Sequence, residues 1–311
     1  MFGYGKVILF GEHAVVYGYP ALAAGLKKGI KCEIGEKREK DFSIHVPSWN
    51  FKVNENDTES LAKALKLILQ NLPKTSQCCE LIITPQIPSK AGIGSSAAVT
   101  VSIIKALLRF FCIDWELSKI NELAFQAESI FHGTPSGIDN TVATYGNLCY
   151  VCDSKKFPLP ESTYKYLKLT KLDAGLLPTL SKSVSMVIVN TQKERETKSL
   201  VNQVRNLYLK KPDYYENIFK NIGSLAKKGY ELLQKMEYKK FGELMELNHQ
   251  YLKELEVSCS ELEQCIKYAK DAGAIGTKLT GAGGGGCLLV FAPGMEETVV
   301  RSEERRVGKE C

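Results

Sequence analysis

The sequence predicts an α+β fold with two domains. Segments typical of strands and of amphipathic helices are mixed along the chain, without the regular strand–helix–strand alternation that builds a parallel sheet. The first half is richer in strand-like segments and the second half in helical ones, so we expect a domain boundary near Ser183. A length of 311 residues is sufficient for two domains with substantial cores.

The N-terminal part of the chain is expected to form mainly strands. The first covers residues 6–10 and ends in a glycine turn. A helix is expected over residues 58–72, with Thr58 as its N-cap and Pro73 just beyond its end. Further strands are expected over residues 18–26, 30–37, 41–47, 51–55 and 79–88, and the segments 41–47 and 51–55 form a predicted hairpin.

Helices dominate the expectation for the rest of the chain. A Gly/Ser loop leads into a long apolar helix within residues 89–111, and a second helix follows over residues 115–131. Apolar residues recur at helical spacing from about residue 198 to residue 270. The remaining strands are expected over residues 146–153 and 184–191, and the segment 274–293 is expected to be strand, glycine loop and strand.

The composition is that of a soluble globular protein, with 44% hydrophobic and 24% charged residues. The net charge of +6 is spread over segments of both signs, which is typical of solvated helix faces rather than of a nucleic-acid-binding surface. No apolar run approaches the roughly 20 residues of a membrane span, and we expect no signal peptide in the opening GYGKVILFGEH. We therefore expect a cytoplasmic protein that binds neither nucleic acid nor membrane.

The ten cysteines predict neither disulfides nor a zinc site. Cys149 and Cys152 form a C-x-x-C pair, but no second pair or histidine follows at a spacing typical of zinc fingers. Scattered thiols in a cytoplasmic protein are usually small buried hydrophobic groups.

The final segment RSEERRVGKEC, residues 301–311, breaks the apolar period of the helix that begins in APGMEETVV. It also resembles the translation of a sequencing-adapter oligonucleotide. We therefore expect these residues to be an artefact of gene assembly, and we expect the C-terminal domain to be truncated.

Two glycine-rich segments are candidate ligand loops. In KAGIGSSAAVT, Gly92 and Gly94 allow close backbone approach, and Ser95 and Ser96 lie at a helix start, where free amides suit a phosphate. A capped helix without a ligand is the alternative. The segment TKLTGAGGGGC matches G-x-G-x-x-G, but a strand follows it where a dinucleotide-binding fingerprint requires a helix.

Two charged segments complete the candidate site. Lys6 begins the first strand, and Glu12 and His13 follow in the turn after it. Glu128 lies near a helix end, eleven residues before Asp139 in ESIFHGTPSGIDN. Taken singly, each of these residues is compatible with an ordinary surface role.

Together the segments resemble the GHMP kinases. GKVILFGEHAVVYG is similar to their first motif, PSKAGIGSSAA to the second and KLTGAGGGGC to the third. GEHAVVYG, HGTPSGIDN and NTQKERETKSLV are most similar to the mevalonate kinases within that superfamily. One departure is Tyr4, where the family usually has proline.

The resemblance implies a fold with a ribosomal protein S5 domain 2-like N-terminal domain over residues 1–182 and a ferredoxin-like C-terminal domain over residues 183–300. It also implies an active site in the cleft between the two domains. The implied reaction transfers the γ-phosphoryl group of ATP to the 5-hydroxyl of mevalonate, in isoprenoid biosynthesis. The implied partners are ATP, Mg²⁺ and mevalonate, and a homodimer is left open.

The resemblance also assigns roles to residues. Asp139 would orient the acceptor hydroxyl or accept its proton, and Lys6 would pair with Asp139. Ser96 and Glu128 would hold Mg²⁺. The ATP phosphates would be wrapped by Lys90, Ala91, Gly92, Ile93, Gly94, Ser95, Ser96 and Ala97. The acceptor would be lined by Glu12, His13, Arg195, Thr197, Gly281, Ala282 and Gly283.

Two other functions stay open at this point. One is a GHMP kinase for a different small acceptor, such as phosphomevalonate or a sugar. The other is a ligand sensor that has the same fold but has lost catalytic turnover. The presence of Lys6, Ser96, Glu128 and Asp139 favours an enzyme.

Overall fold

The computed structural model describes residues 1–38, 40–74, 77–88, 91–132, 135–146, 148–151, 169–171, 186–193 and 197–306. The chain forms two compact units. The first unit comprises Met1–Lys6, Ala24–Ser89 and Ile93–Asn147, and the second comprises Val7–Ala23, Lys90–Gly92 and Leu148–Cys311. No helix among the described residues is long and apolar enough to cross a membrane.

The first unit is built on a mixed sheet. Strands β4 (Phe51–Asn54), β3 (Ser43–Val46), β5 (Cys78–Pro85) and β2 (Ala21–Arg38) lie side by side in that order, and β1 (Phe2–Phe10) pairs with β2. The predicted hairpin is confirmed, because β3 and β4 pair antiparallel, with Ile44 opposite Val53. Strand β3 is parallel to β5, whereas β2 and β5 are antiparallel.

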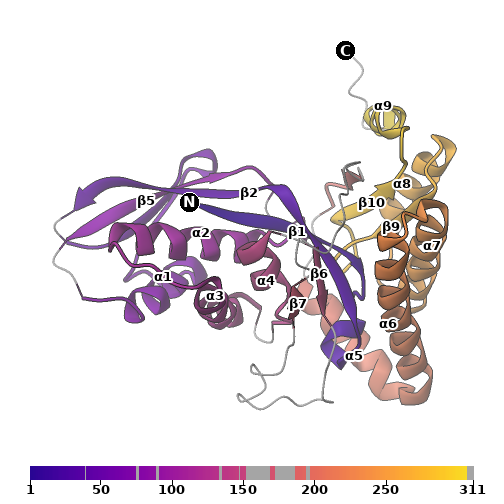
Figure 1. The fold of residues 1–311 in the computed structure, drawn as a ribbon, viewed down its shortest axis with the longest axis horizontal. Helices are drawn as coiled ribbons and strands as arrows, with labels where there is room; N and C mark the ends of the chain where they lie inside the picture. The colour runs from indigo at the N-terminus through magenta and orange to yellow at the C-terminus, as the bar shows by residue number, and fades with distance from the viewer. Residues whose placement is uncertain are drawn as a thin grey trace. The chain divides into compact units, whose positions relative to one another are not determined.

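Four helices lie on one face of this sheet (Figure 1). They are α1 (Ser60–Gln70), α2 (Ser95–Phe110), α3 (Leu117–His132) and α4 (Ile138–Tyr145). Most of α2 is buried, because α3 and α4 also pack against it. A helix enclosed in this way is apolar on nearly all sides. Thr58 is not the N-cap of α1: the helix begins at Ser60, and Glu59 holds the cap position without a side-chain cap bond.

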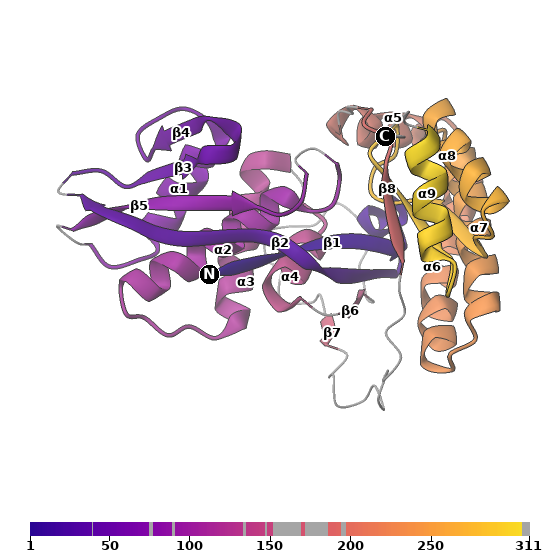
Figure 2. The same ribbon diagram turned by 90° about the horizontal axis from the view of Figure 1, so that it is seen from above.

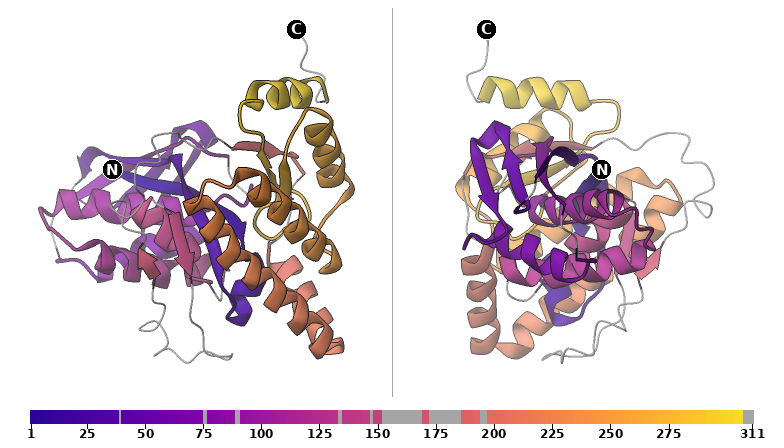
Figure 3. Two further views of the ribbon diagram at one scale, coloured as in Figure 1. Left: turned by 45° about the vertical axis from the view of Figure 1, so that its right-hand side comes forward. Right: turned by 90° about the vertical axis from the view of Figure 1, so that its left-hand side faces the viewer.

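The second unit has a three-stranded antiparallel sheet in the order β8 (Val187–Asn190), β10 (Cys287–Phe291) and β9 (Gly276–Leu279). Its helices are α5 (Thr197–Lys210), α6 (Pro212–Gln234), α7 (Tyr238–Glu254), α8 (Ser260–Asp271) and α9 (Glu296–Arg306), drawn in salmon to yellow in Figures 2 and 3. Helix α6 packs on α7, and α7 packs on β9. Strands β6 (Leu148–Val151) and β7 (Leu169–Lys171) form an antiparallel pair.

The core of the second unit is a continuous cluster of buried apolar side chains. It includes Phe219 and Ile222 of α6, Leu252 of α7, Ile266 of α8 and Leu288 of β10. The cluster explains why the helical pattern between residues 198 and 270 divides into separate amphipathic helices: each turns one apolar stripe inward.

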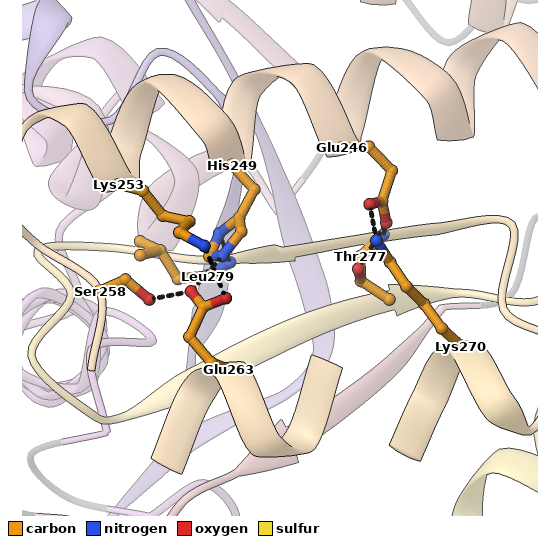
Figure 4. Close-up of polar contacts among 8 residues, drawn as sticks. All are labelled: Glu246, His249, Lys253, Ser258, Glu263, Lys270, Thr277 and Leu279. Carbon is orange, nitrogen blue, oxygen red and sulfur yellow. Dashed lines mark hydrogen bonds and ion pairs between the residues drawn. The ribbon is translucent and has the colours of Figure 1, made fainter. Parts of the chain in front are cut away.

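Helix α7 covers the outer edge of the sheet, as Figure 4 shows. Strand β9 is at that edge, so every second backbone amide of β9 points away from β10. The amide of Thr277 donates to the Glu246 carboxylate at 2.8 Å, and the amide of Leu279 donates to Nδ1 of His249 at 3.4 Å. Side chains of α7 therefore satisfy donors that an exposed edge would leave to water.

His249 can make its contacts only as a neutral ring. Its Nδ1 accepts from Leu279, so its Nε2 carries the proton and donates to Oε1 of Glu263 at 2.9 Å. Ser258 and Lys253 donate to the same Glu263 carboxylate (Figure 4). Burial lowers the pKa of His249, with smaller contributions from Lys278 and Lys253, while Glu263 acts in the opposite direction.

The burial of His249 predicts a loss of protein stability in mild acid. The pKa of His249 is lower in the folded state than in the unfolded state, so the unfolded chain binds the proton first as the pH falls. The contribution of neutral His249 to the free energy of unfolding is present above about pH 6.5. It is lost as the pH falls below that value, by at most about 1.4 kcal/mol per pH unit. Urea unfolding at pH 7.5 and pH 5.5 measures this loss, which should be smaller in His249→Asn. An equal loss in both proteins would contradict the assignment.

Candidate active site

Lys6 and Asp139 form an ion pair in the first unit. Lys6 lies on β1 and is 4% exposed, whereas Asp139 lies in the first turn of α4. The Lys6 Nζ atom is 3.0 Å from Oδ1 of Asp139, and the Asp139 side chain is 27% exposed. The pair thus has one buried member and one member that a ligand can reach.

The second motif passes directly against Lys6. The Lys6 amide donates to the carbonyl of Ile93 at 2.9 Å. Gly94 has a φ of +72°, and a Cβ atom at this position would lie 2.7 Å from Cγ of Lys6. Glycine is therefore needed at position 94 both for the backbone conformation and for the space that Lys6 occupies.

The same glycine begins α2. Gly94 is in the N-cap position and makes no side-chain cap bond, and the first intrahelical bond runs from the amide of Ala98 to the carbonyl of Gly94. The amides of Ser95, Ser96 and Ala97 precede that bond, and they lie at the positive end of the helix dipole. This geometry suits a phosphate. Ala91 and Gly92 precede the turn, and Lys90 lies outside the described residues.

Glu128 and Ser96 form the second polar pair of the first unit. The Ser96 hydroxyl donates to Oε2 of Glu128 at 3.3 Å, and Glu128 is 1% exposed. The pKa of Glu128 is raised to about 8: burial contributes most and the charge of Asp139 also raises it, while Ser96 and Lys6 lower it.

These oxygen donors fit Mg²⁺. Magnesium prefers oxygen ligands such as carboxylates and hydroxyls. Water molecules and substrate phosphates usually supply several of its ligands. Among the described residues, no group of three or more His, Cys, Asp or Glu side chains could hold a metal by itself. A site made of Ser96, Glu128 and phosphate oxygens matches that donor chemistry.

The glycine loop of the third motif lies in the second unit, between β9 and β10. Gly281 and Gly283 both have positive φ, and a Cβ atom on Gly283 would lie 2.0 Å from the carbonyl oxygen of Val257. The strand predicted after the loop is confirmed, so the loop does not open a helix as a dinucleotide-binding fingerprint requires.

His13 contacts this loop. It has a φ of 59°, directly precedes the short 3₁₀ helix Ala14–Tyr17, and its Nε2 is 3.0 Å from the carbonyl oxygen of Ala282. Thr197 is the first residue of α5 and is exposed. Arg195 lies outside the described residues.

Glu12 occupies a different environment from the other predicted acceptor residues. Its side chain is fully buried and forms an ion pair with Nζ of Lys278, and Asn248 donates to its other oxygen at 3.1 Å. Lys278 also donates to the carbonyls of Ile8, at 3.1 Å, and Leu279, at 2.7 Å. These contacts join the turn after β1 to β9 and α7 within the second unit.

Sequence reasoning missed Lys278 and Asn248. The sequence feature that could have indicated this pair is the lysine within the strand GTKL. In the structure every residue of that strand is buried. A buried cation requires an anion, and the acidic residue of the GEH turn is that partner.

Comparison with known proteins gives matches over nearly the whole chain. Residues 59–147 match the model of the GHMP kinases N terminal domain, and residues 230–307 match that of the GHMP kinases C terminal domain. The mevalonate kinase of Pyrococcus abyssi is 34% identical over 94% of this chain and 88% of its own length. That of Thermococcus gammatolerans is 32% identical over 94% of this chain and 89% of its own length.

Solved structures agree. The crystal structure of the L. major mevalonate kinase in complex with R-mevalonate has a TM-score of 0.78 at 28% identity, covering 98% of this chain and 90% of that one. The Methanococcus jannaschii mevalonate kinase also has a TM-score of 0.78, at 29% identity, covering 98% of this chain and 94% of that one. The predicted two-domain GHMP kinase fold is confirmed, and the chain belongs to the GHMP kinases, within the mevalonate kinase branch of that family.

Proposed function

We propose that the chain transfers the γ-phosphoryl group of ATP to the 5-hydroxyl of mevalonate. The observation that carries this proposal is the Lys6–Asp139 ion pair, because it places a reachable carboxylate beside a fixed cation. Relatives of at least 30% identity that are mevalonate kinases support the choice of acceptor. The direct test is a coupled ATPase assay with mevalonate, phosphomevalonate, galactose and homoserine as acceptors. Turnover with mevalonate alone is the expected result.

In this reaction Asp139 orients the acceptor hydroxyl. Phosphoryl transfer depends mainly on positioning and on charge neutralisation, so the carboxylate need only hold the hydroxyl in line and take or stabilise its proton. Lys6 compensates the charge of Asp139 through their 3.0 Å contact and favours the ionised form of the acceptor hydroxyl. Either timing of the proton transfer is compatible with this pair.

The phosphate and metal contacts come from α2 and α3. The amides at the start of α2 bind the phosphates of ATP, and the Ser96 hydroxyl and Glu128 carboxylate hold Mg²⁺. The metal ion would neutralise charge on the phosphate oxygens. Positive charge there would also lower the pKa of Glu128, which burial otherwise raises.

For the acceptor side we propose His13, Arg195, Thr197 and the loop Gly281–Gly283. An arginine can grip the mevalonate carboxylate with two parallel hydrogen bonds. Glu12 supports this side indirectly, since its carboxylate is fully buried against Lys278 and Asn248. It holds the turn that carries His13.

The role of the ion pair can be tested by removing each charge. Asp139→Asn and Lys6→Met should each lower turnover by about two to four orders of magnitude, the usual cost of losing a general base. The double variant should lose little more than either single one, because the two groups act as a unit. Steady-state kinetics measures turnover, and calorimetry should show that ATP still binds. Asp114→Asn removes an exposed carboxylate of the same unit and serves as the control. Turnover in Asp139→Asn within about threefold of the parent would refute the assignment.

The metal assignment predicts a magnesium-dependent defect. Glu128→Gln keeps the side-chain shape but removes the charge, so binding of Mg²⁺-ATP should weaken much more than binding of ATP in EDTA. Calorimetric titrations with and without Mg²⁺ measure both. Glu122→Gln, on an exposed position of the same helix α3, is the matched control. An equal loss of ATP affinity with and without Mg²⁺ would show that Glu128 is not a metal ligand.

The acceptor assignment predicts a separate effect on the two substrates. Arg195→Lys keeps the charge but loses the planar fork, so the KM for mevalonate should rise while the KM for ATP changes little. Initial-rate kinetics with each substrate varied in turn distinguishes the two constants. A change in the KM for ATP alone would indicate that Arg195 contacts the nucleotide instead of mevalonate.

A further inference from the structure

Lys105 makes an unusual pair of contacts within the first unit. It lies on α2, in a stretch where most neighbouring residues are buried. Its Nζ atom donates to the carbonyl of Phe2 at 3.2 Å and to the carbonyl of Thr144 at 3.1 Å. Phe2 is the first residue of β1, and Thr144 lies in the last turn of α4. One ammonium group therefore joins the beginning of a strand to the end of a helix.

The contact with α4 is favoured by the helix itself. Carbonyl groups in the last turn of a helix have no intrahelical donor, and the negative end of the helix dipole attracts a cation. Thr144 is 2% exposed, so water cannot readily satisfy its carbonyl group. Lys105 is partly buried, and this burial lowers the pKa of its ammonium group.

Tyr4 encloses the same junction. Its ring lies 5.8 Å from Nζ of Lys105 and packs edge-on against the Phe2 ring at 5.0 Å between centroids. It also covers Gly146, the C-cap of α4, where a Cβ atom would lie 2.4 Å from the Tyr4 ring. The aromatic contact with the ammonium group adds a cation–π attraction to the two hydrogen bonds of Lys105.

The two elements that Lys105 joins are those that carry the ion pair. Lys6 follows Phe2 by four residues on β1, and Asp139 precedes Thr144 by five residues on α4. We propose that Lys105 is a positioning residue that sets the separation of Lys6 and Asp139 by tying β1 and α4 to α2. This inference rests on the proposed function, in which that pair acts on the acceptor hydroxyl.

The alternative is that Lys105 only stabilises the fold. A double-mutant cycle separates the two roles, because a positioning residue acts through the ion pair and a purely stabilising residue does not. Lys105→Met removes both hydrogen bonds, and Lys105→Gln is a milder variant that keeps a polar group. Each is made in the parent and in Asp139→Asn. Lys119→Met is the control, since the Lys119 ammonium group also lies over an aromatic ring, Trp115, at 3.9 Å.

In the parent, Lys105→Met should lower kcat about tenfold to a hundredfold, the range for a small misplacement of reacting groups, with the KM for ATP nearly unchanged. In Asp139→Asn the same substitution should cost less than about threefold, because the group that it positions is already lost. Lys119→Met should leave kcat unchanged in both backgrounds. Circular dichroism checks that each variant is folded, and Lys105→Gln replaces Lys105→Met in the cycle if the latter is not.

Two results would overturn the inference. The first is an equal fold-decrease in kcat when Lys105 is substituted in the parent and in Asp139→Asn. The second is an unchanged kcat when Lys105 is substituted in the parent. A parent protein that fails to phosphorylate mevalonate would instead refute the proposed function. The two failures are therefore distinguishable in one set of assays.

Discussion

The ion pair between Lys6 and Asp139 depends on the absence of a side chain at Gly94. A Cβ atom on residue 94 would lie only 2.7 Å from Cγ of Lys6, so the close approach of the strand and the turn requires a glycine at this position. The same residue takes the left-handed conformation from which α2 starts. One glycine thus sets both the approach of Lys6 and the position of the amides that suit a phosphate.

Much of this arrangement could be predicted from the sequence. The main strands and long helices follow from apolar periodicity, and the hairpin follows from two short strand-like segments around a turn. The nearness of Lys6 to Asp139 was expected from the family resemblance, not from spacing alone. Helix α4 was not predicted, because its run IDNTVATY contains β-branched residues that disfavour helices. In the structure, Thr141 and Thr144 bond back to carbonyls one turn earlier, and packing against α2 and α3 stabilises the helix.

Buried polar contacts were the least predictable part. The bonds that Lys278 and Lys105 make to backbone carbonyls join segments that are distant in sequence, and no local pattern specifies such a partner. The same is true of His249, whose two ring nitrogens serve a strand amide and the Glu263 carboxylate. Each of these groups is costly to bury unless it is satisfied. Their partners are therefore structural requirements that become visible only in three dimensions.

Glu12 and Asp139 differ in solvent exposure, although the sequence motifs do not distinguish them. Glu12 and Asp139 both belong to family motifs, and both face a lysine. Removing one partner of a buried pair such as Glu12–Lys278 costs about 3–5 kcal/mol, so its carboxylate cannot easily turn to a substrate. Asp139 keeps about a quarter of its side chain exposed, and Lys6 compensates its charge without covering it. A carboxylate in that position can exchange a solvent contact for a hydroxyl at little cost, so the difference in burial supports the proposed chemical role of Asp139 and the proposed supporting role of Glu12.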